Sequence, residues 1–478
     1  MPNEKLVPAQ AEFNSSQSAL RIPMTLLTNV MKGNGLFERL LRSVGWAAFG
    51  FAAAQMIRLI SNLIFTRLLF PEAFGLMALV SVFLVGLSMF SDVGISSSIM
   101  QNKRGDDQEF LNTAWTIQVI RGVLLWLGCC AVAWPAASFY NEPQLAELLP
   151  VAGLSLLIAG FNPTQIDSSN RHLMLGRVIL IDLASQIIAA IAMIALAFAL
   201  RSVWALVFGA IIAAIAKLTL AYTFLPNAGN RPRWEKEAAH ELVHFGKWIF
   251  FSTALAFMIA QGDKAILGKY LSLDLLGIYN IGYFLASAPL LLGGAIISRI
   301  LIPLYRERPP GASPENFHKI RLMRFALTGA IMSLVLVMAF CGVWLVNTLY
   351  DSRYVLAGPI VVSLAFAQII QVIGLTYDQA ALAAGDSRNF FFLFATRALV
   401  QITFFVVGVE TAGLLGAIAG QALSMLFVHP MIIALARKHD AWDPLHDMVF
   451  ALIGLSLGAI ALWINQDAVM TLAGFGKP

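Results

Sequence analysis

The sequence predicts an all-helical protein that crosses a membrane many times. Residues of the AVILMFWYC set make up 59% of the 478-residue chain and charged residues only 12%, and the mean hydropathy is +0.76. An average soluble domain has roughly 45–50% apolar and about 25% charged residues. So few charges cannot cover a soluble surface, which excludes a disordered chain, a disulfide-rich secreted module and an ordinary cytoplasmic enzyme.

Apolar stretches of about 20 residues, the length that crosses a hydrocarbon core as a helix, recur along the chain. About forty mostly polar residues precede the first stretch, so we expect an anchor rather than a cleavable leader. The roughly thirteen predicted spans are 44–69, 73–96, 112–136, 146–164, 176–199, 202–224, 247–268, 276–303, 322–349, 355–384, 388–408, 411–436 and 446–465.

The positions of Lys and Arg predict the orientation. With the N-terminus in the cytoplasm, most of the 32 Lys and Arg residues fall on that side, including Lys103, Arg104, Arg231 and Arg324. The outer loop 138–145 then has no basic residue. The excess of positive charge inside predicts a cytoplasmic N-terminus and, with an odd number of spans, an outer C-terminus.

A charged segment and an internal repeat predict two lobes. The stretch Arg67-Leu-Leu-Phe-Pro-Glu-Ala-Phe-Gly-Leu aligns without gaps, 202 residues later, with Lys269-Tyr-Leu-Ser-Leu-Asp-Leu-Leu-Gly-Ile. Both stretches follow an outward span, so the lobes should be related by an axis along the membrane normal, although two tight turns can also resemble each other by chance. We expect a cytoplasmic tail at 1–43, a six-span lobe at 44–224, a linker helix at 225–246, a second six-span lobe at 247–437, and an appended span within 438–478.

Five short stretches carry a family resemblance. They are Leu69-Phe-Pro-Glu-Ala-Phe-Gly-Leu, Ser91-Asp-Val-Gly-Ile-Ser-Ser-Ser, Asn112-Thr-Ala-Trp, Phe245-Gly-Lys-Trp and Gln261-Gly-Asp-Lys-Ala-Ile-Leu-Gly. Across most of 36–437 the chain resembles the bacterial oligosaccharide flippases of the polysaccharide-transporter family. The resemblance implies the fold of the multidrug, oligosaccharidyl-lipid and polysaccharide exporter superfamily, in which two six-helix lobes form a V around a central cavity.

The same resemblance implies a task and a location. The task is to carry an undecaprenyl-diphosphate-linked oligosaccharide across the bacterial inner membrane for exopolysaccharide, capsule or O-antigen synthesis. Its partners would be that lipid, the surrounding membrane, and a polysaccharide polymerase and export complex. The predicted thirteenth span departs from the twelve or fourteen spans common in the family.

Basic residues inside the spans are the first candidate site. Arg or Lys at the centre of a span costs about 2.5–3.5 kcal/mol on insertion scales, so each is a functional candidate by default. Arg58 and Arg397 lie nearest the middle of their spans. Arg121, Lys217 and Arg299 lie nearer the cytoplasmic ends, where snorkelling to the interface explains them equally well.

Spacing groups some polar residues on one helix face. Gln55, Arg58 and Asn62 stand at i, i+3 and i+7, which places them on one stripe of the first span. Asp263 and Lys264 lie at the corresponding place in the second lobe, where the alternative is that they mark the outer end of the seventh span. Arg grips phosphate through bidentate hydrogen bonds, so a cationic cavity suits a lipid diphosphate.

Acidic residues inside the spans are fewer. Asp182 in the fifth span and Asp378 in the tenth could bind H⁺ or Na⁺ in a coupled cycle, or pair with a basic neighbour such as Arg121 or Arg397. We favour the ion pair, because charges within membranes usually find partners. The excess of basic residues also disfavours the alternative function, a multidrug exporter of organic cations from the same superfamily.

One enzyme motif is present but weakly supported. His240-Glu-Leu-Val-His244 matches H-E-x-x-H, in which two histidines bind zinc and the glutamate acts as a base. The acid Asp263 would lie about 28 Å further along the helix, too far for a third ligand. We therefore interpret the motif as part of a connecting helix and expect no metal, cofactor, nucleic-acid partner or enzymatic activity. A non-transporting scaffold in a polysaccharide assembly complex is a third possibility.

Overall fold

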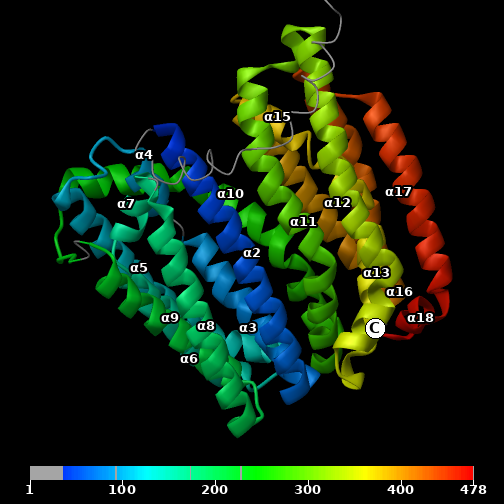
Figure 1. Ribbon diagram of the computed structural model, residues 1–478. Coiled ribbons are helices and arrows are strands. Elements are labelled where there is room, and N and C mark those ends of the chain that lie inside the picture. Colours follow the sequence, from blue (N-terminus) through cyan, green and yellow to red (C-terminus); the bar gives the residue numbers. More distant parts are fainter. Residues whose placement is uncertain (1–35, 92–93, 173, 227–228, 477–478) are drawn as a thin grey trace, which may run out of the picture.

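The protein is an all-helical bundle in two halves that lie side by side in the computed structural model (Figure 1). The structure describes residues 36–91, 94–172, 174–226 and 229–476, so most of the predicted tail 1–43 lies outside it. The helices of the first half are α2 (Leu36–Leu68), α3 (Pro71–Phe90), α4 (Ile95–Gln101), α5 (Gln108–Tyr140), α6 (Leu145–Gly160), α7 (Gln165–Arg171), α8 (Leu175–Leu200) and α9 (Trp204–Phe224).

The second half follows the same all-helical plan. Its helices are α10 (Lys236–Tyr270), α11 (Leu273–Glu307), α12 (Pro314–Leu349), α13 (Ala357–Ala367), α14 (Ile369–Gly374), α15 (Asp378–Ala383), α16 (Ser387–Lys438), α17 (Pro444–Ile464) and α18 (Gln466–Met470). Short 3₁₀ turns lie at Pro310–Ala312, Ser352–Tyr354 and Thr471–Gly474. Most predicted spans fall on one of these helices or on part of one, whereas 355–384 covers α13, α14 and α15, and the prediction of a polytopic all-helical fold is confirmed.

The number of spans depends on how bent helices are counted. The described residues contain nine helices long and apolar enough to cross a membrane, or up to eleven if each of two bent pairs is one span. The bent pairs are α6 with α7 and the stretch Ser352–Ala367 with Ile369–Ala383. Helix α16 joins two predicted spans across a kink at Ala412 and Gly413, where the φ of Gly413 is +63°. The exact count of thirteen stays a prediction.

The two halves meet where α3 crosses α11. A Cβ atom on Gly75 would lie 2.0 Å from the carbonyl oxygen of Leu273, and a Cβ atom on Gly277 would lie 2.0 Å from that of Pro71. Only glycine permits backbones to approach so closely. Because Leu273 and Gly277 each lie 202 residues after Pro71 and Gly75, the repeat found in the sequence makes a reciprocal contact.

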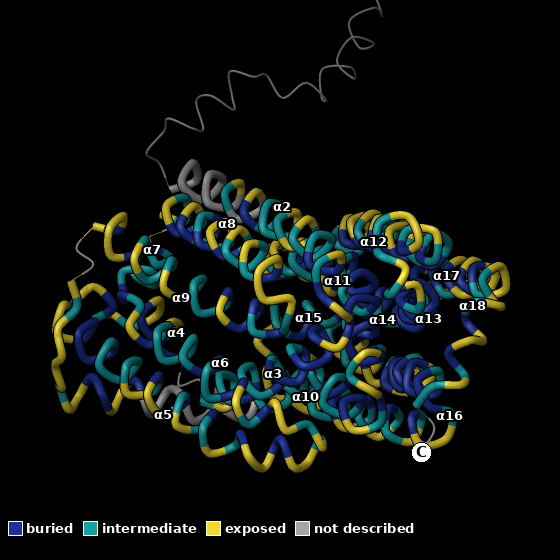
Figure 2. The backbone as a smooth tube through the Cα atoms, turned by 90° about the horizontal axis from the view of Figure 1, so that it is seen from below, coloured by how far each residue is buried: buried dark blue, intermediate teal, exposed yellow. Residues whose placement is uncertain are grey.

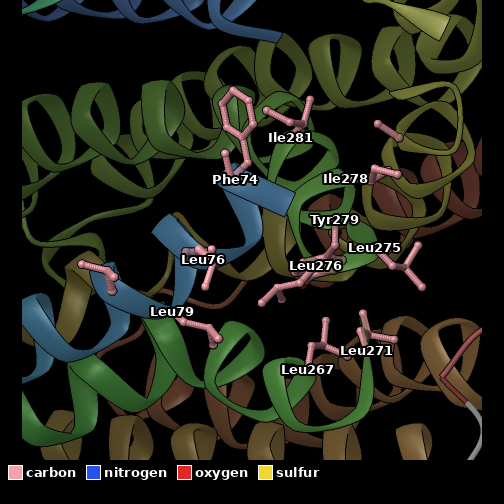
Figure 3. Close-up of a cluster of buried hydrophobic side chains, with 14 of the residues drawn as sticks. Phe74, Leu76, Leu79, Leu267, Leu271, Leu275, Leu276, Ile278, Tyr279 and Ile281 are labelled. Carbon is pink, nitrogen blue, oxygen red and sulfur yellow. The ribbon is translucent and has the colours of Figure 1, made fainter. Parts of the chain in front are cut away.

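Apolar packing surrounds this crossing. The close-up in Figure 3 shows Phe74, Leu76 and Leu79 beside side chains of α10 and α11, among them Leu267 and Leu276. In Figure 2 the buried residues gather where α3, α13 and α14 run through the middle of the bundle, and the exposed ones lie on outward faces. The largest buried core therefore lies between the halves as well as within them.

Hydrogen bonds join the halves at the end of the bundle where α2 ends. Arg353 donates to the carbonyl oxygens of Thr66 and Arg67 at 3.2 and 3.1 Å, and Tyr354 donates to that of Leu69 at 3.0 Å. Tyr350 donates to Asn62 Oδ1 at 3.2 Å. Within the described residues, every hydrogen bond between α2–α9 and α11–α18 lies at this end, which we call the joined end.

The linker before α10 is fixed to the first half. Arg104 pairs with Glu235 at 2.8 Å and with Asp107 at 2.7 Å, and Asn102 donates to Glu241 at 2.7 Å. These hydrogen bonds from Arg104 hold the pKa of both Asp107 and Glu235 below their usual values. Helix α10 then runs unbroken from Lys236, so the predicted linker 225–246 contains an extended stretch and the first turns of α10.

Candidate functional site

The polar stripe on α2, formed by Gln55, Arg58 and Asn62, contains a cation without a carboxylate partner and a residue that contacts the other half of the protein. Arg58 is exposed, and its only hydrogen bond or ion pair in the described residues is a 3.4 Å hydrogen bond to Gln55 Oε1. Asn62, one turn further on, accepts the hydrogen bond from Tyr350 at the joined end. The stripe therefore presents a free guanidinium on the helix that also contacts the second half.

The other two predicted basic residues of the first half are already engaged. Lys217 on α9 pairs with Asp182 on α8, with a distance of 2.7 Å between Nζ and Oδ1. Arg121 donates to Ser91 Oγ at 3.0 Å and to the carbonyl oxygen of Ser88 at 2.7 Å, at the end of α3. A cation at a helix C-terminus is favoured by the helix dipole. Asp182 thus pairs with Lys217 rather than with Arg121 or Arg397, because α8 and α9 pack directly together.

A second charged pair lies inside the second half. Arg397 Nη1 on α16 is 3.8 Å from Asp378 Oδ2 at the start of α15, and the two side chains are only 11% and 16% exposed. This separation is too long for a hydrogen bond. Asp378 Oδ1 and Arg397 Nε have no hydrogen-bond partner in the described residues. Both groups therefore keep hydrogen-bonding capacity that an ion or a substrate could use.

Asp263 and Lys264 lie next to two tyrosines of α11. The Asp263 side chain is buried and accepts a 2.8 Å hydrogen bond from the Tyr279 hydroxyl, so it is not a solvated helix end. Lys264 Nζ lies 5.0 Å from the centre of the Tyr283 ring and 3.5 Å from Gln261 Oε1. Asp263 and Lys264 thus lie beside tyrosines of α11 rather than in solvent, whereas no hydrogen bond or ion pair joins Arg58 and Arg397 in the described chain.

One fully buried charge was not among the residues predicted for the site. Arg324, which we counted among the basic residues on the cytoplasmic side, is 0% exposed. Its guanidinium donates to Tyr305 Oη at 2.9 Å and lies 4.7 Å from the centre of the Tyr377 ring, while its two terminal nitrogens have no partner in the described residues. Its place on the cytoplasmic side stays a prediction. Arg324 lies near the start of the predicted span 322–349, flanked by Leu322, Met323 and Phe325, and that apolar run was the available signal of its burial.

Tyr377 contacts Arg324 and also belongs to a hydrogen-bond network that holds α17 against the second half. Its hydroxyl donates to Asp447 Oδ1 at 2.7 Å, and the ring of His446 lies 2.9 Å from the Thr328 hydroxyl. Arg321 forms a bidentate pair with the fully buried Asp443. The residues contributed by α17 and the turn before it make the appended span an integral part of the second half.

The H-E-x-x-H motif lies on the first turns of α10. His240 and Glu241 are exposed, and the Glu241 carboxylate accepts the hydrogen bond from Asn102. The side chain of His244 lies outside the described residues. Across the part of the chain that the structure describes, no group of three His, Cys, Asp or Glu residues is placed to hold a metal ion.

The charged residues predicted for the spans add up to a cationic surplus. Each predicted acid has a partner: Asp182 has Lys217, Asp378 has Arg397, and Asp263 has the Tyr279 hydroxyl. Arg58 and Lys264 have no carboxylate partner in the described residues. Such an arrangement favours an anionic ligand over a cationic one.

Sequence comparison identifies relatives of this chain. Residues 64–357 match the family described as polysaccharide biosynthesis protein. The amylovoran biosynthesis protein AmsL of Erwinia amylovora is 24% identical over 354 residues, which cover 70% of this chain and 88% of AmsL. The lipopolysaccharide biosynthesis protein WzxC of Escherichia coli strain K12 is 19% identical over 395 residues, which cover 80% of this chain and 78% of WzxC.

Structure comparison shows the same fold in solved transporters. The lipid II flippase MurJ in an inward closed conformation matches with a TM-score of 0.62 at 10% identity, covering 89% of this chain and all 100% of MurJ. A multidrug resistance MATE family transporter in an inward-facing conformation matches with a TM-score of 0.58 at 14% identity, covering 86% and 96%. At these identities the likeness shows the two-lobed fold alone.

Proposed function

Because the chain belongs to the polysaccharide biosynthesis protein family, we propose that it moves an undecaprenyl-diphosphate-linked oligosaccharide across the bacterial inner membrane. The lipid would pass from the cytoplasmic to the outer leaflet and supply the synthesis of a surface polysaccharide. In this role the protein is a transporter and not an enzyme, and its substrate is the lipid-linked sugar. A polysaccharide polymerase and export complex would use the product on the outer side.

The cationic surplus among the charged residues of the spans supports this proposal most directly. A lipid diphosphate carries about two negative charges, and guanidinium groups replace part of its lost hydration through bidentate hydrogen bonds. Arg58 has no carboxylate partner in the described residues, and the Nε atom of Arg397 has no hydrogen-bond partner there. We assign the diphosphate to a central cavity bordered by these two residues, with Gln55, Asn62 and Lys264 available to the sugar hydroxyls.

The contacts between the halves suggest how the cycle runs. We propose that the lobes 44–224 and 247–437 rock about the axis that relates Gly75 to Gly277, opening the two ends in turn. With the N-terminus in the cytoplasm, the joined end faces outward, and this structure corresponds to the state that admits substrate from the cytoplasm. Asp378 is the better candidate for H⁺ or Na⁺ coupling, because its Oδ1 atom has no partner in the described residues and Asp182 is in close contact with Lys217.

Transfer between leaflets tests the proposed function. The purified protein is placed in vesicles with a fluorescent undecaprenyl-diphosphate oligosaccharide prepared from the cells that make this chain. A reductant that cannot cross the membrane bleaches the fluorophore in the outer leaflet, and the loss of fluorescence over time gives the rate of transfer between leaflets. We expect faster transfer than in protein-free vesicles, and no acceleration of a lipid that carries the same sugar without phosphate. Accelerated uptake of an organic cation such as ethidium, without lipid transfer, would instead support the multidrug exporter.

A further inference from the structure

A polar pocket lies at the joined end of the first half, away from the charges considered above. The starts of α3, α6 and α9 surround it, and its volume is about 380 Å³. This volume lies near the lower end of the roughly 300–1,000 Å³ range of ligand pockets, which leaves room for about one or two sugar rings. Its lining includes the side chains of Phe70, Glu72, Gln144, Glu147, Arg201 and Trp204.

The polar side chains of this pocket are not used by the fold. Glu72, Gln144, Glu147 and Arg201 make no side-chain hydrogen bond or ion pair with another residue in the described chain. Glu72 and Glu147 stand in the first turns of α3 and α6, where acids favour the helix dipole. Favouring the helix dipole does not require four polar side chains without hydrogen-bond partners to line the same pocket. Their free donors and acceptors are what a ligand with several hydroxyl groups needs.

Arg201 occupies a position where glycine is the usual residue. It caps the C-terminus of α8 with a φ of +49°, in the left-handed region. An L-residue is strained there, and glycine is not. Arg201 supplies the only positive charge among the residues that line the pocket. Arg201 therefore combines a strained backbone with a side chain that makes no hydrogen bond or ion pair in the described chain.

Two aromatic rings complete the pocket. Phe70 is 60% exposed, and Trp204 stacks on Phe208 with ring centroids 5.5 Å apart. Such a ring has an apolar face that covers the C–H face of a sugar, while neighbouring polar groups bind its hydroxyls. Aromatic residues also gather at membrane interfaces. Here, however, both border the same pocket as the unengaged Glu72, Glu147 and Arg201.

We propose that this pocket binds one or two sugar units of the oligosaccharide head group after it has crossed the membrane. The inference rests on the proposed function for the identity of its ligand. Two carboxylates face one guanidinium, so the pocket prefers neutral or amino sugars to uronic acids. Its place at the joined end means that it receives the head group on the side where the polymer is assembled and not on the side where the substrate enters.

Binding of the free sugar tests the inference separately from transport. The probe is the oligosaccharide released by mild acid from the lipid-linked pool of the cells that make this chain, and binding to the full-length protein in nanodiscs is measured by saturation-transfer NMR. We expect Trp204→Leu and Glu147→Gln to weaken binding by about tenfold. The matched control is Trp463→Leu, an exposed tryptophan on α17, which should bind like the wild type.

Arg201→Gly separates a binding role from a structural one. The substitution relieves the left-handed backbone and removes the guanidinium, so we expect a thermal midpoint at or above that of the wild type together with about tenfold weaker binding. Unchanged binding in both Arg201→Gly and Trp204→Leu, or no binding by the wild type, would overturn the inference. Lipid transfer without sugar binding would overturn this inference alone, whereas sugar binding without lipid transfer would overturn the proposed function and leave the pocket standing.

Discussion

Gly75 and Gly277 make the same contact in opposite directions. A Cβ atom added to Gly75 would meet the backbone carbonyl of Leu273, and one added to Gly277 would meet the backbone carbonyl of Pro71. Each residue of one contact has its counterpart 202 positions along the chain in the other. The pair therefore marks the approximate twofold axis between the halves, at the only end where α2 and Leu69 accept hydrogen bonds from the second half within the described residues.

Gly75→Ala and Gly277→Ala should each weaken the joined end. A methyl group 2.0 Å from a carbonyl oxygen must displace backbone, and such overpacking costs about 1–3 kcal/mol. We expect a lower thermal midpoint and greater labelling of a cysteine placed at Leu69. The control is Gly294→Ala on α11, whose Cβ atom would meet nothing within 4 Å. Equal behaviour of Gly277→Ala and Gly294→Ala would contradict the role of the close approach.

Loss of one partner of the Asp378–Arg397 pair should cost more than loss of both. Arg397→Gln leaves a buried carboxylate without its counter-charge, which costs about 3–5 kcal/mol. The double variant Arg397→Gln with Asp378→Asn should recover most of that loss, as measured by thermal unfolding in detergent. For comparison, the exposed pair of Lys319 and Glu315 should contribute about 0–1 kcal/mol. Additive losses at Asp378 and Arg397 would mean that the two charges do not interact.

Arg324 should tolerate an apolar side chain of similar length. Its terminal nitrogens are buried without partners in the described chain, so Arg324→Met removes an unsatisfied charge while retaining the packing against Tyr305 and Tyr377. We expect a thermal midpoint at or above that of the wild type. Arg324→Ala leaves a cavity instead and should lose about 2–5 kcal/mol. A large loss in Arg324→Met would show that the buried charge itself stabilises the fold.

The contact between the linker and α5 should weaken in acid. Arg104 lowers the pKa of Asp107 and Glu235, so their contribution is complete above the unfolded values of about 3.9 and 4.3 and is lost as pH falls below them. Limited pepsin digestion between about pH 5 and pH 3 should show increasing cleavage near Trp234 as the pH falls. In Arg104→Gln the cleavage should already be high at pH 5 and change little. Identical pH profiles for both proteins would rule out this linkage.

The sequence predicted the helices well because membrane spans are long apolar runs. It also located the repeat that forms the joined end, since Gly75 and Gly277 stand at equal places in two short turns. It placed a break between the spans 388–408 and 411–436, close to the kink at Gly413, but it did not divide the predicted span 355–384, which the structure bends between Ala367 and Ile369.

Individual side chains of the candidate site were harder to predict. Periodicity placed Gln55, Arg58 and Asn62 on one face of α2, but partners depend on which helices pack together. Lys217 meets Asp182 because α8 lies beside α9, and Arg324 is buried where Tyr377, the residue before α15, lies over its guanidinium. Such contacts between distant segments leave no periodic signal in a single sequence.

The most direct test of the central claim is lipid transfer by variants of Arg58. Leaflet transfer of the fluorescent undecaprenyl-diphosphate oligosaccharide is compared for the wild type, Arg58→Ala, Arg58→Lys and the control Arg177→Ala, an exposed residue near the start of α8. The account predicts that Arg58→Ala abolishes the acceleration, that Arg58→Lys keeps part of it because the charge remains without the bidentate geometry, and that Arg177→Ala transfers normally. Wild-type transfer rates in folded Arg58→Ala would contradict the claim that this cation binds the diphosphate.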